Sequence, residues 1–177
     1  MIKTQQPKVK PKNETLLFGH NFSDHMLEID FQDGKWSPPV LKPYSPLVLD
    51  PSCSVFHYGL ECFEGMKAYK DSSNQCRLFR PEMNMSRFLK SAQRLSLPSF
   101  DPEELLKCIK ELVKLDSDWI PKEKGYSLYI RPTLISTEPT LGVASPTKVF
   151  GSYQRRKYSL FVHQLVLTIK QDSMQST

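Results

Sequence analysis

Hydrophobic and polar residues alternate with a period of two in several stretches of the chain, and this pattern predicts β-strands. The clearest stretches are Met26–Phe31 and Tyr126–Ile135. Glu64–Tyr69 and Cys76–Phe79 have the composition of two strands joined by the polar turn Asp71–Asn74, which predicts a hairpin. Strands are therefore expected in both halves of the chain.

Between the hairpin and the last strand, apolar residues recur at intervals of three and four, and this spacing predicts two helices. The first helix begins at Pro81. Its apolar stripe consists of Met85, Phe88, Leu89, Ala92 and Leu95. The second helix begins after Asp101, whose side chain is suited to capping, and ends at Pro121. Its stripe consists of Leu105, Leu106, Ile109, Leu112 and Val113.

The order of these elements, several strands, two helices and a further strand, is typical of an α+β fold with a mostly antiparallel sheet. A chain of 177 residues with 39% hydrophobic residues is long enough for one domain with a real core. Residues 1–14 have no periodicity and include Pro7 and Pro11, so they are predicted to form a flexible arm. We assign residues 15–148 to the folded domain and residues 149–177 to a divergent tail.

The charge and the cysteine and histidine content argue against nucleic-acid binding, disulfides and metal binding. The net charge of +5 is modest and the basic residues are scattered, so a nucleic-acid partner is not expected, although Arg155–Lys157 is a short basic run. The cysteines are Cys53, Cys62, Cys76 and Cys108, and the histidines are His20, His25, His57 and His163. Their spacing predicts free thiols and no metal site.

The start of the chain lacks the apolar segment of a secretion signal, and Tyr158–Ile169 is too short and too polar to cross a membrane. We therefore expect no membrane partner. A cytoplasmic location is predicted, with a mitochondrial location as the alternative.

Three short motifs carry more information than composition. The first is Phe56–Tyr69, which is dense in aromatic residues and glycine. The second is Arg77–Pro81, which leads into Asn84–Arg87, and the third is Ser127–Pro132, which leads into Glu138–Val143. Together they resemble the signature of the branched-chain amino acid aminotransferases.

The resemblance runs from about Leu16 to Lys148. It implies the small amino-terminal domain of the fold-type IV pyridoxal-phosphate enzymes, which are D-amino acid aminotransferase-like. It also implies pyridoxal 5'-phosphate as cofactor, branched-chain amino acids and 2-oxo acids as substrates, and a homodimer.

The same resemblance implies that Arg87 binds the phosphate of the cofactor. A guanidinium suits this role because its fork of donors matches phosphate oxygens at fixed charge. By spacing alone, Arg87 would be one more member of a solvated basic helix face.

The resemblance further implies a substrate pocket walled by Phe18, Tyr58, Phe63 and Tyr129, whose plainer interpretation is as core aromatics. Arg131 follows Tyr129 by two positions, so both side chains project from one face of the strand. Arg131 is expected to orient the pocket or contact a carboxylate. Substrate contacts are also implied for Leu141 and Val143, in a stretch that otherwise reads as a loop.

Cys62 lies within the aromatic motif and raises the possibility of a nucleophile. No base accompanies it in the sequence, so a buried structural thiol is the favoured interpretation.

The lysine that forms the Schiff base in the family lies in a second domain, so we predict no catalytic residue in this chain. After Lys148 the sequence no longer resembles the family. An alternative transcript or a misassembled gene would produce such an ending. The apolar run Leu160–Ile169 is expected to lack a partner domain.

The chain is therefore interpreted as a branched-chain aminotransferase by descent, transferring the amino group of leucine, isoleucine or valine to 2-oxoglutarate, truncated before the lysine and inactive alone. The alternative is a noncatalytic module that pairs with a full-length subunit.

Overall fold

The centre of the computed structural model, which describes residues 1–12, 15–141 and 157–168, is an eight-stranded sheet in which every pairing is antiparallel. The strands are β1 His25–Gln32, β2 Lys35–Trp36, β3 Val40–Pro43, β4 Glu61–Phe63, β5 Met66–Lys70, β6 Cys76–Leu78, β7 Tyr126–Ser136 and β8 Lys157–Thr168. They are ordered β2-β1-β8-β7-β5-β6, with β3 on β1 and β4 on β7.

The helices are α1 Ser54–Tyr58, α2 Pro81–Arg94 and α3 Pro102–Leu115, and a 3-10 turn follows at Ser117–Trp119. The predicted α+β class, the hairpin and both long helices are confirmed. The short helix α1, within the aromatic motif, was not predicted. The predicted end of the second helix at Pro121 is wrong, because α3 ends at Leu115.

The early end of α3 has a physical reason in the buried pairing of Asp116 with His25. The Asp116 carboxylate accepts a hydrogen bond from the His25 backbone N–H at 3.0 Å and lies 2.6 Å from His25 Nδ1. A buried carboxylate needs such partners. The need for these partners places Asp116, the residue after α3, against His25 at the start of β1.

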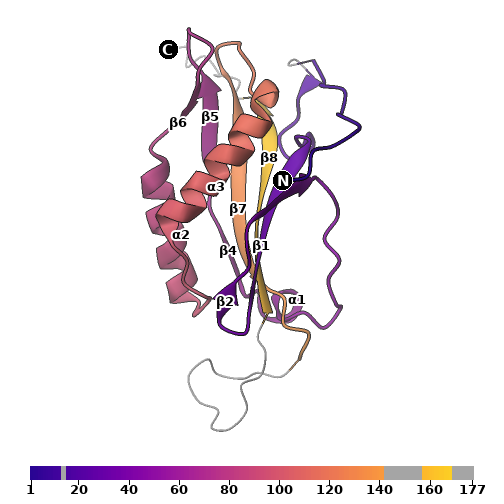
Figure 1. Ribbon diagram of the computed structural model, residues 1–177, viewed down its shortest axis with the longest axis vertical. Helices are drawn as coiled ribbons and strands as arrows, with labels where there is room; N and C mark the ends of the chain where they lie inside the picture. The colour runs from indigo at the N-terminus through magenta and orange to yellow at the C-terminus, as the bar shows by residue number, and fades with distance from the viewer. Residues whose placement is uncertain (13–14, 142–156, 169–177) are drawn as a thin grey trace, which may run out of the picture.

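Helices α2 and α3 lie on one side of the sheet (Figure 1). The side chain of Asp101 accepts hydrogen bonds from the backbone N–H groups of Glu103 and Glu104, so the predicted cap of α3 is confirmed. All five residues of the predicted α3 stripe are buried, whereas the α2 stripe is buried at Met85, Phe88 and Ala92 but 37% exposed at Leu95.

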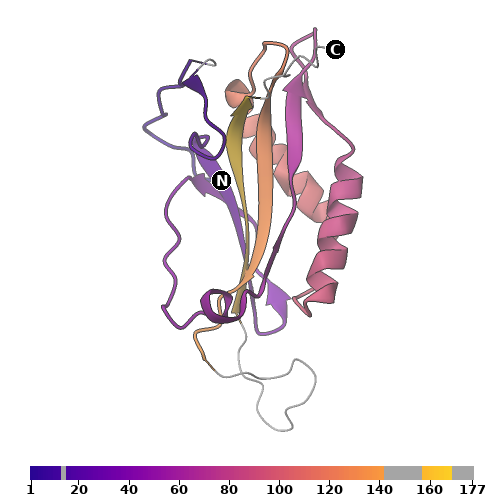
Figure 2. The same cartoon turned by 180° about the vertical axis from the view of Figure 1, so that it is seen from behind.

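Strand β7 has two different faces, as its period of two predicted. Leu128, Ile130 and Leu134 are fully buried in the core. Tyr129 and Arg131 alternate with them and are half-buried. Figure 2 shows β5, β7 and β8 toward the viewer, with α3 behind them and α2 to one side.

Strand β8 lies within the predicted tail and joins the two halves of the sheet. It pairs with β7 from Tyr126 to Ser136 and with β1 from Leu27 to Gln32. Leu160 and Val162 are 1% and 0% exposed, so this part of the apolar run is buried within the same domain. The expected absence of a partner domain stays a prediction. The predicted boundary after residue 148 lies outside the described residues.

The amino-terminal arm makes specific hydrogen bonds along β1 and β3. The backbone N–H of Ile2 donates to the Leu41 carbonyl at 2.8 Å, and that of Thr4 donates to His25 Nε2 at 3.0 Å. Lys8 Nζ donates to the Ser23 carbonyl at 2.7 Å. The flexibility of residues 1–14 stays a prediction.

Replacing Leu160 by alanine is expected to lower the free energy of unfolding by about 2–5 kcal/mol, because it removes buried methyl groups from the centre of the sheet. Val48→Ala is the control, since Val48 is 98% exposed and its loss should change stability by less than about 0.5 kcal/mol. Urea denaturation measures both, and equal effects would contradict the central position of β8.

Candidate active site

Arg87 projects from α2 and is held by a fork of hydrogen bonds to Glu64. Its Nε donates to Glu64 Oε1 and its Nη2 donates to Glu64 Oε2, both at 2.9 Å. Glu64 also accepts from Asn84 Nδ2 at 2.9 Å and from the backbone N–H of Gly65 at 3.3 Å. Asn84 Nδ2 donates in addition to the Gly65 carbonyl at 2.8 Å. These contacts tie α2 to the segment between β4 and β5.

The charges of this pair reinforce each other. Burial acts to raise the pKa of Glu64, but the hydrogen bonds from Arg87, Asn84 and Gly65 outweigh it and lower that pKa below its usual value. Hydrogen bonding to Glu64 raises the pKa of Arg87 in turn. Glu64 is therefore a carboxylate, and Arg87 a cation, throughout the neutral range.

Arg87 and Tyr129 line the same cavity, of about 310 Å³. Its lining is Gly65, Met66, Lys67, Tyr69, Phe79, Arg80, Met83, Asn84, Arg87 and Tyr129. Three of these residues, Lys67, Arg80 and Arg87, carry positive charge, and Lys67 lies opposite Tyr129 in the β5–β7 pairing. Such a lining favours an anionic ligand with an apolar or aromatic body.

The structure brings four of the predicted substrate-pocket residues together beside this cavity. The Tyr129 and Phe18 rings meet edge to face with centroids 5.5 Å apart. Arg131 Nε and Nη2 donate to the Tyr129 hydroxyl oxygen at 3.1 and 2.9 Å, and its guanidinium lies 4.3 Å from the centroid of Phe63. Because Arg131 donates, the O–H of Tyr129 remains available to donate to a ligand. Phe18 and Phe63 are 54% and 55% exposed, so they are surface aromatics rather than core.

Gly65 allows this arrangement because it has no side chain. A Cβ at Gly65 would lie 2.1 Å from the Tyr129 hydroxyl oxygen, so the Tyr129 side chain would have to shift. The same dipeptide, Glu64-Gly65, therefore holds Arg87 on one side and admits Tyr129 on the other.

Tyr58 and Leu141 form a second group at the end of the sheet near α1. The Tyr58 hydroxyl donates a hydrogen bond to the Leu141 carbonyl. Leu141 is 57% exposed and Tyr58 41% exposed. Val143, the remaining predicted substrate residue, lies outside the described residues.

Sequence reasoning missed Glu64, Asn84 and Lys67. Glu64 and Lys67 stand inside the aromatic motif and Asn84 lies one helical turn before Arg87. The spacing of Asn84 and Arg87 places them on one face of α2, but no pattern shows that both converge on Glu64. That convergence depends on the position of residues 64–65, which link β4 to β5 alongside β7.

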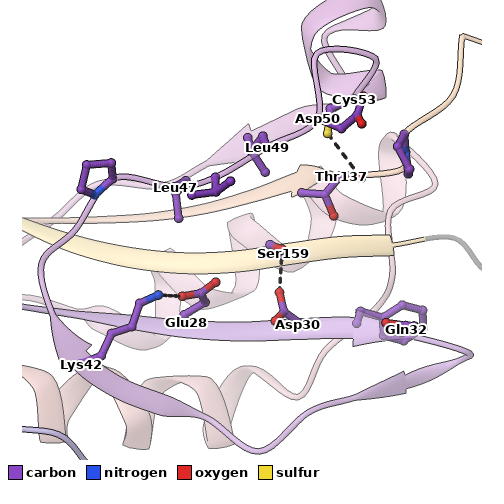
Figure 3. A pocket seen from close by; sticks show the side chains of 14 residues that line it. Glu28, Asp30, Gln32, Lys42, Leu47, Leu49, Asp50, Cys53, Thr137 and Ser159 are labelled. Atoms are coloured by element: carbon purple, nitrogen blue, oxygen red, sulfur yellow. Dashed lines mark hydrogen bonds and ion pairs between the residues drawn. The ribbon is translucent and has the colours of Figure 1, made fainter.

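A further cavity, of about 520 Å³, contains none of the predicted site residues (Figure 3). Two pairs of its polar groups bind each other: Lys42 pairs with Glu28, and Ser159 Oγ donates to Asp30 at 2.7 Å. Cys53 Sγ faces the Thr137 carbonyl at 3.4 Å.

Cys62 is buried at 7% exposure, and burial, with Glu61 nearby, raises its pKa to about 11. A thiol of this kind is a poor nucleophile, in agreement with its interpretation as structural. Among residues 1–12, 15–141 and 157–168, the structure contains no cluster of metal-ligating side chains. None of the helices in that part of the chain is long and apolar enough to cross a bilayer.

No protein-family model matches the chain, but individual known proteins do. The chain is 54% identical over 149 residues to the cytosolic branched-chain-amino-acid aminotransferase of Saccharomyces cerevisiae. Its relatives are branched-chain aminotransferases. The mitochondrial branched-chain-amino-acid aminotransferase of Bos taurus is 52% identical over 147 residues. These matches cover 83% and 82% of this chain but only 40% and 37% of the relatives.

A solved branched-chain aminotransferase, from the thermophilic archaeon Thermoproteus uzoniensis with norvaline, superposes with a TM-score of 0.55 at 23% identity. The match covers 78% of this chain and 40% of that one. The predicted fold class, the small domain of fold-type IV aminotransferases, is confirmed.

Gly65→Ala is expected to displace the Tyr129 ring and to lower the free energy of unfolding by about 1–3 kcal/mol, because the new Cβ overlaps the ring. In a Tyr129→Ala background the same change should cost far less, since the clashing ring is gone. Urea denaturation of the four proteins of this cycle measures the coupling. Additive effects would contradict the close approach of Gly65 and Tyr129.

The lowered pKa of Glu64 makes its contribution to stability depend on pH. Since the folded-state pKa lies below the unfolded value of about 4.3, the stabilisation is complete above about pH 5 and is lost as the pH falls through the folded pKa. Wild type should therefore exceed Glu64→Gln in stability by a constant margin from about pH 5 to 7, and the margin should shrink below about pH 4. A margin independent of pH in urea denaturation would refute this pairing.

Proposed function

We propose that this chain supplies the phosphate-binding and substrate-facing part of a branched-chain aminotransferase site. The observation that carries the proposal is the shared cavity of Arg87 and Tyr129, in a chain about half identical to branched-chain aminotransferases. Because the chain spans 37% to 40% of those relatives, the activity of a whole enzyme is not attributed to it.

The residues present fit pyridoxal 5'-phosphate. Arg87 would hold the phosphate, with Lys67 and Arg80 adding positive charge to the same cavity. When bound, the cofactor supplies a reactive carbonyl and an electron sink for amino transfer. Tyr129 offers a hydroxyl to the bound substrate, and Arg131 orients that hydroxyl.

The exposed aromatic side chains would take the aliphatic part of leucine, isoleucine or valine, with an amino group passing to 2-oxoglutarate. Apolar walls distinguish such side chains by only about 1–3 kcal/mol per methylene, so a broad preference within this group is proposed. Because the Schiff-base lysine of the family is expected in a second domain, we propose that the 177 residues do not transaminate by themselves. A cytosolic location is proposed, although the relatives include both cytosolic and mitochondrial enzymes.

The exposure of Phe18, Phe63 and Leu141 supports a second proposal, that the chain pairs with another subunit through these apolar residues. Sedimentation of the chain mixed with a full-length branched-chain aminotransferase separates the two functions, because only pairing produces a larger species.

Arg87→Ala is expected to weaken binding of pyridoxamine 5'-phosphate by about tenfold or more, because it removes charged hydrogen bonds to the phosphate. Arg94→Ala is the matched control, an exposed arginine two turns along the same helix and outside the cavity. Isothermal titration measures affinity, and glutamate formation from leucine and 2-oxoglutarate measures activity. Equal binding by wild type and Arg87→Ala would refute the site, and turnover by the chain alone would refute its inactivity.

A further inference from the structure

Arg87 has two edges at which its guanidinium donates hydrogen bonds, and Glu64 occupies only one. The carboxylate of Glu64 takes the side edge, formed by Nε and Nη2. Nη1 makes no hydrogen bond among the described residues. Glu64 therefore fixes the side edge of Arg87. The end edge, formed by Nη1 and Nη2, keeps donors that a ligand could use.

Glu64 is itself immobilised. It accepts four hydrogen bonds, two from Arg87 and one each from Asn84 and the Gly65 N–H, and its side chain is only 12% exposed. Asn84 is 7% exposed and bridges Glu64 to the Gly65 carbonyl. A free arginine side chain loses much rotamer entropy when it binds a ligand. Because Glu64 already orders Arg87, less entropy is lost when a phosphate binds.

We propose that Glu64 is a positioning residue for phosphate binding, because it fixes Arg87 by its side edge and turns the end edge to the ligand. This inference rests on the proposed function and goes beyond it by naming the residue that preorganises the phosphate site. Electrostatic repulsion alone predicts the opposite effect, because a carboxylate near a phosphate anion should weaken phosphate binding.

Two substitutions separate positioning from charge. Glu64→Gln removes the negative charge and one strong acceptor, whereas Glu64→Asp keeps the charge but shortens the side chain by one methylene. If Glu64 positions Arg87, both variants lose the fork and weaken pyridoxamine 5'-phosphate binding by about three- to tenfold. If only charge matters, Glu64→Gln binds more tightly and Glu64→Asp is unchanged.

The experiment is isothermal titration of the 177-residue chain with pyridoxamine 5'-phosphate, which has no aldehyde to react with surface lysines. Glu82→Gln is the control, because Glu82 is an exposed carboxylate on α2 outside the cavity. All variants are titrated at a temperature at which circular dichroism shows them folded. The Arg87 Nε–H signal in nitrogen-15 NMR adds a readout of the fork itself.

Weaker binding by Glu64→Gln and Glu64→Asp but not by Glu82→Gln, with loss of the Arg87 signal, is the expected result. Binding that depends on Arg87 but is unchanged or tighter in Glu64→Gln would overturn the positioning role and leave the proposed function intact. Absent wild-type binding, or binding equal in Arg87→Ala, would overturn both.

Discussion

The pairing of strand β7 holds both the sheet and the site residues in position. The strand pairs with β4, β5 and β8, so its backbone is the common neighbour of three strands. Its period of two sends Leu128, Ile130 and Leu134 into the core and Tyr129 and Arg131 to the other face. Burial of the three apolar residues fixes the register of β7. The register in turn fixes the positions of Tyr129 and Arg131. The positions of the site residues therefore follow from hydrophobic packing on the opposite side of the same strand.

A second constraint connects the helical layer to that face. The pairing of Arg87 with Glu64 joins α2 to the segment between β4 and β5, and Gly65 in the same segment admits Tyr129. Arg87 and Tyr129 thus line one cavity although they come from a helix and a strand. Displacing this segment would move both side chains at once.

The periodic elements were predictable because each carries a repeated pattern. All five residues of the predicted α3 stripe are buried. The alternation of β7 was confirmed from Leu128 to Leu134, whereas Ser127 and Ile135 are buried as well. Helix α1 was missed because five residues are too few to show a period. The end of α3 was wrong because it depends on Asp116 meeting His25, a residue 91 positions earlier in the chain.

Part of the candidate site was predictable from family motifs rather than from periodicity. Arg87, Tyr129 and Arg131 stand in motifs shared with a known family, so a resemblance could nominate them. Glu64 and Asn84 could not be assigned a role, because their significance lies in contacts between segments 19 to 23 residues apart. Strand β8 has no motif, and its place between β1 and β7 follows only from the assembled sheet.

Residues 157–168 complete the sheet that carries the site residues. Hydrogen exchange of the backbone amides, followed by mass spectrometry, measures whether they do so in solution. We expect the amides of β8 to exchange as slowly as those of β7, because the two strands pair from Tyr126 to Ser136. Rapid exchange in 157–168 beside slow exchange in 126–136 would contradict this pairing.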